Sequence, residues 1–231
     1  GSSSINGMTY VRGHPLDFEG WAGAGLPSWN WAHCLPYFRR LEGYDKGANE
    51  WRGGDGPLRI TTAKADELFF QAFLEAGKQA GVGFTEDPNG FRLEGVHVQQ
   101  TTTYKGERWS SAKAYLRPAL GRLNLIVRTG TRVDAVILDK TRAVGVRVRT
   151  GGDKETITAA REVILCTGAI GSPHLLMLSG IGDADELRRH GITPAVHLPG
   201  VGRNLEDHPA TAVQYTAKNE RSVAHRLGAM G

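Results

Sequence analysis

The chain has 231 residues, 40% hydrophobic and 23% charged, a balance typical of globular proteins and not of disordered or fibrous ones. A formal net charge of +4 at pH 7 favours anionic ligands only weakly and does not indicate nucleic acid. The two cysteines, Cys34 and Cys166, lie in unlike contexts and form no disulfide framework, and no apolar run is long enough to span a membrane. We therefore expect a protein that is cytoplasmic or peripheral to a membrane. The sequence begins with Gly1, so it does not show the natural amino terminus.

The chain opens on a segment of small and polar residues, numbers 1–13. Its amides and hydroxyls can reach the phosphate or ring oxygens of a ligand, and Asn6 can both donate and accept hydrogen bonds. Taken alone, the same segment is better explained as a serine- and glycine-rich loop without a ligand. The residues that offer these small groups are Gly1, Ser2, Ser3 and Gly7.

Two helices are predicted in the first half of the chain. Apolar residues recur with helical spacing near 31–44 and, more clearly, within 66–80. Residues 43–56 between them are rich in glycine and charge, which is typical of a loop. The tryptophans at positions 21, 29 and 31 could cover a cofactor, but we expect them to pack a loop.

The middle of the chain is predicted to be mainly extended. Residues 96–104 look like a strand, and 110–116 like a helix that begins behind a serine cap and ends at Pro118. After residue 124, apolar and polar residues alternate, which predicts an antiparallel sheet with one solvent-exposed face and solvated arginines. The alternating runs are 125–128, 132–138, 143–150 and 156–160.

Residues 161–182 read as strand, tight turn and helix in one run. The apolar stretch 163–166 predicts a strand buried on both faces, and the small residues 167–171 allow a sharp turn. Ser172 is a good helix cap and Pro173 a good first helical residue, with a helix end expected near 179–180. Free amides at such a helix start could bind an anionic cofactor. An ordinary strand-to-helix corner explains the pattern about as well.

Two clusters of ionisable residues near the carboxyl terminus could suggest metal binding or acid–base catalysis, but we assign neither role. Residues 183–186 could suggest a metal site, but they match the acidic first turn of a helix that ends near His190. Asp207 and His208 could do acid–base work, yet a structural pair is commoner. No catalytic residue and no metal ligand is therefore predicted from either group.

Small residues, a proline and an apolar pair follow in fixed order through Gly168-Ala169, Ser172-Pro173, Leu175-Leu176 and Ser179-Gly180-Ile181-Gly182. This order resembles the second signature of the glucose-methanol-choline (GMC) oxidoreductases, flavoenzymes that bind FAD and oxidise alcohols. Residues 1–13, followed by Asp17 and Trp21, are similar to the first signature of that family. Residues 108–116 and 201–208 resemble it too, so the resemblance extends over nearly the whole chain.

The resemblance implies an FAD site built from both signatures. In the family, the first signature runs along the flavin and the pyrophosphate, and the residue that matches Val133 meets the adenine through its backbone. Some members attach FAD through a histidine at the position of Ile5, so we expect non-covalent FAD here. The cofactor-contacting residues implied in this way are Gly1, Ser2, Ser3, Asn6, Gly7, Met8, Val133, Gly168, Ala169 and Ser172.

Two features of the family are absent from the sequence. No stretch satisfies G-x-G-x-x-G, which the family carries upstream of this match, and no histidine matches its catalytic one, which lies downstream. We therefore expect the chain to be the middle of such an enzyme, without both flanks. Neither a nucleophile elbow nor a Cys/His cluster with zinc spacing occurs, which disfavours hydrolase and metalloprotein functions.

The predicted fold class is α/β, a partial FAD-binding (Rossmann-like) domain with an inserted antiparallel sheet. Residues 1–216 would belong to the FAD-binding domain, and 217–231 would begin a substrate-binding domain. The predicted activity is FAD-dependent oxidation of a CH–OH group in a small alcohol or choline-like substrate, with hydride passing to the flavin and an unknown electron acceptor. A non-catalytic flavin-binding or interaction fragment is the alternative, and a nicotinamide dehydrogenase is a weaker third choice.

Overall fold

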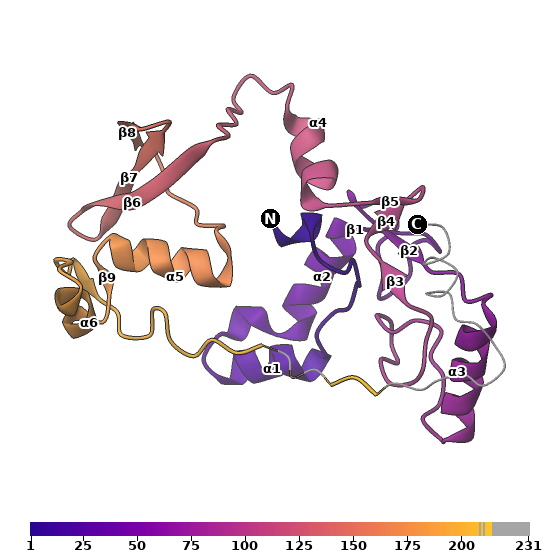
Figure 1. Cartoon of the computed structure of the whole chain (residues 1–231). Helices are drawn as coiled ribbons and strands as arrows, with labels where there is room; N and C mark the ends of the chain where they lie inside the picture. Colours follow the sequence, from indigo (N-terminus) through magenta and orange to yellow (C-terminus); the bar gives the residue numbers. More distant parts are fainter. Residues whose placement is uncertain (208, 210, 214–231) are drawn as a thin grey trace. The chain divides into compact units, whose positions relative to one another are not determined.

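The computed structural model describes residues 1–207, 209 and 211–213, and its chain forms two compact units. Of the described residues, 1–125 form the first unit and those between 126 and 213 form the second. Figure 1 labels the helices and strands of both units. The domain boundary predicted between 216 and 217 lies outside the described residues.

Helices α1 (Pro15–Gly23), α2 (Trp31–Leu41) and α3 (Leu68–Gln79) belong to the first unit, with 3-10 turns at Ser2–Ser4 and Pro27–Trp29. The predictions of α2 and α3 are confirmed. Sequence reasoning missed α1, although its start carries a clear signal. His14 and Asp17 form a capping box around it, and Pro15 occupies the first helical position.

An aromatic cluster joins α1 to α2. The ring of Phe18, which is buried, lies 5.2 Å from the rings of both Trp21 and Trp31 and 5.7 Å from that of Phe38. Trp29 adds an edge contact to Trp21 at 6.0 Å. The tryptophans thus pack with one another and with Phe18 around the loop between α1 and α2, as expected, and the contacts extend to residues of both helices.

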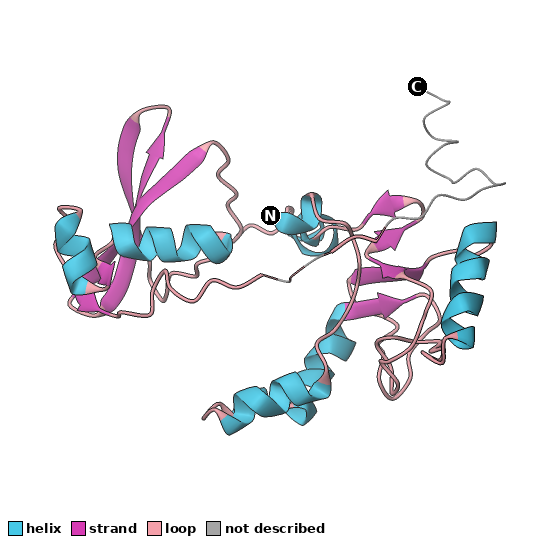
Figure 2. Cartoon of the chain, turned by 60° about the horizontal axis from the view of Figure 1, so that its bottom comes forward, coloured by secondary structure: helices cyan, strands magenta, loops and turns pink. Residues whose placement is uncertain are grey.

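The first unit also contains a three-stranded sheet and a short hairpin (Figure 2). β1 (Glu42–Tyr44) pairs in parallel with β2 (Leu58–Thr62), which pairs antiparallel with β3 (Gln100–Thr101). β4 (Thr103–Tyr104) and β5 (Glu107–Arg108) form the hairpin. In the three-stranded sheet, the buried apolar residues are Tyr44 of β1 and Ile60 of β2. Parts of the extended stretch predicted at 96–104 thus become strands.

The helical segment after β5 runs further than predicted. A π-helical turn, η3 (Ala112–Leu116), leads directly into α4 (Arg117–Ala119). Pro118 lies within this segment, which continues one residue further and ends at Ala119. The serine cap is partly present, since Ser110 Oγ lies 3.4 Å from the amide of Lys113.

The second unit is organised on an antiparallel sheet of β6 (Thr131–Asp139), β7 (Arg142–Thr150) and β8 (Asp153–Thr158), in that order. The prediction of an inserted antiparallel sheet is confirmed. Its buried face includes Val136 and Val148, and α5 packs against β6 (Figure 1). The run 125–128 is not a strand, because no described strand lies beside it to share hydrogen bonds.

Helix α5 spans Gly168–Leu178 and ends where the sequence predicts, with Ser179 as its C-cap. Its predicted start is wrong. The helix begins at Gly168, behind Thr167, so Ser172 and Pro173 lie inside it. Because Gly168 has φ +89°, the turn that starts the helix is made there instead of at the serine–proline pair.

The strand predicted at 163–166 does not form, which is a second correction in this region. Residues 163–166 have no strand assignment, and Ile164 is 74% exposed. A strand buried on both faces needs hydrogen-bonded neighbours on its edges. Among the described residues none pairs with this stretch, so the apolar run remains extended chain.

The second unit closes with α6 (Ala184–Arg189) between β9 (Ile181–Gly182) and β10 (Val196–His197), two strands that pair in parallel. The acidic helix start is confirmed, because Asp183 caps α6 by accepting from the amides of Asp185 and Glu186. These backbone hydrogen bonds lower the pKa of Asp183. In the part of the chain that the structure covers, no helix is both long and apolar enough to cross a membrane.

Candidate functional site

The first predicted segment, residues 1–8, folds into one compact loop. A 3-10 turn covers Ser2–Ser4, and the side-chain oxygen of Asn6 accepts a hydrogen bond from the amide of Met8 at 3.1 Å. Met8 itself has φ 63°, in the left-handed region that non-glycine residues seldom adopt. The loop therefore has a defined turn at Asn6 and Met8 and is not an extended tail.

Residues of β3, of the bend after it and of the turn at Asn89 fix the end of this loop. Met8 O accepts from the amide of Thr102 at 2.8 Å, and the amide of Tyr10 donates to Gln100 O at 2.8 Å. The side chain of Asn89, which is only 1% exposed, bonds both the amide of Arg12 and the carbonyl of Tyr10. These contacts join residues between 77 and 94 positions apart, so the loop is held by tertiary structure and not by local propensity.

A buried charged cluster lies beneath the end of the loop, and sequence reasoning missed it. Glu42 accepts from the guanidinium groups of Arg12 and Arg52 and from the amide of Gly53. Burial raises the pKa of Tyr10 to about 12, with the negative charge of Glu42 adding to the effect and Arg12 opposing it. Isolated charged residues far apart in the sequence give no pattern from which such a cluster could be inferred.

The residues of this loop fit the close approach of a ligand to the backbone. Cβ atoms built at Gly1 and Gly7 would meet no atom within 4 Å, and neither glycine has a positive φ. Packing within the chain therefore does not require glycine at these two positions, whereas the close approach of a ligand to the backbone would. Ser2 is exposed beside them, and Ser3 is half-buried.

The second predicted segment starts helix α5 in the other unit. No side chain caps this helix, so the amides of Gly168, Ala169 and Ile170 are free to bind an anion at the positive end of the helix dipole. A Cβ at Gly168 would also meet nothing within 4 Å. Ser172 lies one turn along, with its hydroxyl 3.0 Å from that of Thr167.

Two hollows border this helix start. Ala169 and Ser172 line a hollow of about 610 Å³ whose opposite wall is residues 200–205. Val133 lines another, of about 410 Å³, together with residues 162–167. The structure thus brings residues 200–205 to the predicted site, a role that sequence reasoning did not give them. His208, from the same motif, lies outside the described residues.

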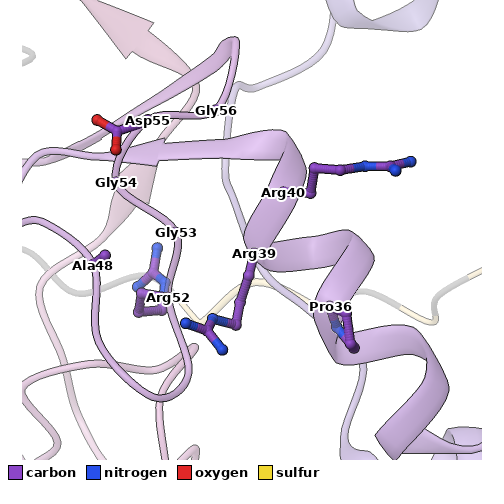
Figure 3. A pocket seen from close by; sticks show the side chains of 9 residues that line it. All are labelled: Pro36, Arg39, Arg40, Ala48, Arg52, Gly53, Gly54, Asp55 and Gly56. Carbon is purple, nitrogen blue, oxygen red and sulfur yellow. The ribbon is translucent and has the colours of Figure 1, made fainter.

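A third hollow, of about 440 Å³, contains none of the predicted residues (Figure 3). It lies between the end of α2, with Arg39 and Arg40, and the glycine-rich loop 53–56. Packing explains these glycines. A Cβ at Gly53 would lie 1.7 Å from Arg39 O, and one at Gly56 would lie 2.3 Å from the carbonyl carbon of Leu41. Their presence is therefore no sign of a phosphate-binding loop.

No metal chemistry emerges from the described ranges. Within residues 1–207, 209 and 211–213, no group of three or more His, Cys, Asp or Glu side chains could hold a metal ion. Both cysteines, Cys34 and Cys166, are free thiols. The features that stand out are therefore backbone amides, small residues and one asparagine, which suit the recognition of a cofactor more than acid–base catalysis.

Comparison with known proteins identifies the family to which this chain belongs. The profile of the GMC oxidoreductases matches residues 1–210, which include both loop segments and the sheet between them. The chain belongs to the GMC oxidoreductase family. The family resemblance inferred from the two signatures is thereby confirmed, together with the α/β class.

The relatives of this GMC oxidoreductase, and the similar proteins of solved structure, are longer than the chain. It is 51% identical over 214 residues to the mitochondrial choline dehydrogenase of Homo sapiens, covering 93% of this chain and 36% of that protein. It is 48% identical to an oxygen-dependent choline dehydrogenase of Staphylococcus xylosus, covering 98% of this chain and 41% of that one. The chain therefore spans well under half the length of these curated relatives.

Two solved structures resemble the fold closely. Pyridoxine 4-oxidase from Mesorbium loti is 36% identical with a TM-score of 0.85, covering 90% of this chain and 41% of its own. An FAD-dependent oxidoreductase from Chaetomium thermophilum is 27% identical with a TM-score of 0.84, covering 90% of this chain and 38% of its own.

Proposed function

We propose that this chain supplies the cofactor-contacting part of an FAD-dependent oxidoreductase that acts on the CH–OH group of a small, choline-like alcohol. The observation that carries the proposal is the match to the GMC oxidoreductases over residues 1–210, with both signature segments folded into ligand-accessible turns. The sequence identity of 51% and 48% to two choline dehydrogenases supports a choline-like alcohol as the substrate.

The proposed division of labour follows from the groups that each segment presents. Residues Gly1 to Met8 would lie along the flavin and pyrophosphate, where the open faces of Gly1 and Gly7 admit a ligand. The free amides at Gly168 and Ala169 would bind a phosphate group. Val133 would offer its backbone to the adenine. When bound, FAD would supply the redox chemistry, and the chain would supply orientation and charge.

We further propose that FAD is held without a covalent bond, because Ile5 has no nucleophilic side chain. Residues 1–216 would form the FAD-binding part, and 217–231 would begin the substrate-binding part. The protein would be cytoplasmic or peripheral to a membrane.

The test is anaerobic mixing of choline with the purified protein encoded by the reading frame that contains this sequence. We expect a bound flavin whose visible absorption is bleached by choline without added nicotinamide. A protein that retains flavin but is bleached by no alcohol would favour the alternative, a non-catalytic flavin-binding protein. A protein that carries no flavin and needs a nicotinamide cofactor would overturn the proposal.

A further inference from the structure

One arginine holds the loop that the proposed function places along the flavin. Nη1 of Arg108, at the end of β5, lies 2.7 Å from the backbone oxygen of Asn6 and 2.8 Å from its side-chain oxygen. The same nitrogen lies 3.3 Å from the carbonyl of Ser3. A single guanidinium group thus bonds both ends of the turn that begins the chain.

These contacts determine which way the amide of Asn6 faces. Its Oδ1 accepts from Arg108 and also from the amide of Met8 at 3.1 Å. If the amide were flipped, its NH₂ group would face two donors, which costs the hydrogen bonds and adds repulsion. The orientation is therefore fixed with Nδ2 directed away from Arg108, and among the described residues Nδ2 has no hydrogen-bond partner.

The strand that carries Arg108 is itself held firmly. The amide of Trp109 donates to Thr102 O at 2.8 Å, and its indole Nε1 donates to Pro57 O at 2.8 Å. The amide of Ser111 donates to Ser3 Oγ at 3.1 Å, which adds a second link to the loop. The guanidinium group is thus positioned by tertiary contacts before any ligand arrives.

Arg108 also contributes a positive charge that no carboxylate neutralises within the described chain. Its neighbour Glu107 pairs instead with Lys113, whose hydrogen bond and charge lower the pKa of Glu107. The partners of Arg108 are carbonyl oxygens, which satisfy its donors without cancelling its charge. The half-buried guanidinium group therefore biases this loop towards an anionic ligand.

We propose that Arg108 is a positioning residue, which fixes the side-chain amide of Asn6 so that Nδ2 donates to an oxygen or ring nitrogen of the cofactor. The inference rests on the proposed function. Arg108 does not touch the reacting atoms. It acts through Asn6 and through the shape of the turn between Ser3 and Met8.

The test uses the complete protein, stripped of flavin and titrated with FAD, and compares the Kd and the midpoint potential of the bound flavin. Arg108→Gln is expected to raise the Kd about 10- to 100-fold, the range of one charge-assisted hydrogen bond, and to lower the potential, because a positive charge stabilises reduced flavin. Arg108→Lys should partly restore both values, since it keeps the charge but not the fork geometry. Arg122→Gln, at an exposed arginine of the same unit, is the matched control and should change neither.

A double-mutant cycle separates positioning from general destabilisation. If Arg108 acts through Asn6, adding Arg108→Gln to Asn6→Ala should raise the Kd by much less than it does in the wild-type protein. Additive effects, or an unchanged Kd and potential in Arg108→Gln, would overturn the inference while leaving the proposed function intact. If the wild-type protein binds no FAD at all, both fail.

Discussion

Arg52 donates to both carboxylate oxygens of Glu42, from Nε to Oε1 at 3.0 Å and from Nη2 to Oε2 at 3.1 Å, and neither side chain is exposed to solvent. Burial alone would lower the pKa of Arg52, but the hydrogen bonds and charge of Glu42 raise it above its ordinary value. Arg12 adds a second guanidinium to the same carboxylate. One carboxylate thus joins the segment that follows residues 1–8 to the loop after β1.

Removing the carboxylate of Glu42 should destabilise the protein strongly. Glu42→Ala leaves two buried cations without their shared partner, and we expect the free energy of unfolding to fall by about 3–5 kcal/mol. Glu42→Gln keeps the shape and one acceptor, so its loss should be smaller. Denaturant unfolding of the purified protein measures both, with Glu50→Ala, at an exposed glutamate of the same unit, as the control. A loss in Glu42→Ala no larger than in the control would contradict the assignment.

Ser179 should couple helix α5 to the edge of the sheet. Its hydroxyl accepts from the amide of Val136 at 2.8 Å and donates to Leu175 O at 2.6 Å. Ser179→Ala leaves the amide of Val136 without this acceptor, at a cost of about 1–3 kcal/mol. Hydrogen exchange at that amide should quicken, whereas Ser179→Thr should keep its protection. Equal exchange rates in the wild type and Ser179→Ala would mean that the hydrogen bond is not made in solution.

Alkaline pH should report on the half-buried phenol of Tyr10. Burial raises its pKa from 10.0 to about 12, so the stabilisation that it contributes is fully present below pH 10.0 and is lost as the pH rises through about 12. The free energy of unfolding should therefore fall less steeply over this window in Tyr10→Phe than in the wild type. Tyr37→Phe, at a tyrosine that is 62% exposed, should retain the wild-type slope. Identical slopes in all three proteins would refute the assigned burial.

The residue Ile5 leads to the prediction that FAD is not bound covalently, and this can be tested. Because isoleucine offers no nucleophile, acid precipitation of the flavin-loaded protein should release all of its flavin into the supernatant. The amount is read from absorbance after neutralisation. Colour that stays with the washed precipitate would show a covalent link at some other residue.

Local signals predicted α2, α3, α6 and the sheet β6–β7–β8, because periodicity and capping residues act within a few positions. Distant partners explain only the failure at 163–166, whereas α1 and the start of α5 were mispredicted although their deciding residues are local. The apolar run 163–166 reads as a strand, but no described strand pairs with it. At α5, the serine–proline pair suggested a start at residue 172, whereas a left-handed glycine at residue 168 makes the turn.

The site shows the same division. Small residues in the two loop segments could be singled out from the sequence by their resemblance to a family. The clamp of Arg108 on Asn6 could not be, because it joins residues about one hundred positions apart. Nor could Glu42 be foreseen as the shared partner of Arg12 and Arg52, since charge patterning is informative along one helix or strand and not between them.

The decisive measurement for the proposed cofactor contact at the start of α5 is the amount of flavin that copurifies with the complete protein when Gly168 is changed. Gly168→Val adds a branched side chain at the free start of α5 and strains a backbone with φ +89°, so the proposed phosphate contact should be obstructed. Gly151→Val makes the same change at another left-handed glycine, φ +63°, in the turn between β7 and β8, where a Cβ also meets nothing. We expect nearly one flavin per chain in the wild type and Gly151→Val, and little in Gly168→Val. Equal flavin content in Gly168→Val and Gly151→Val would contradict the proposed contact.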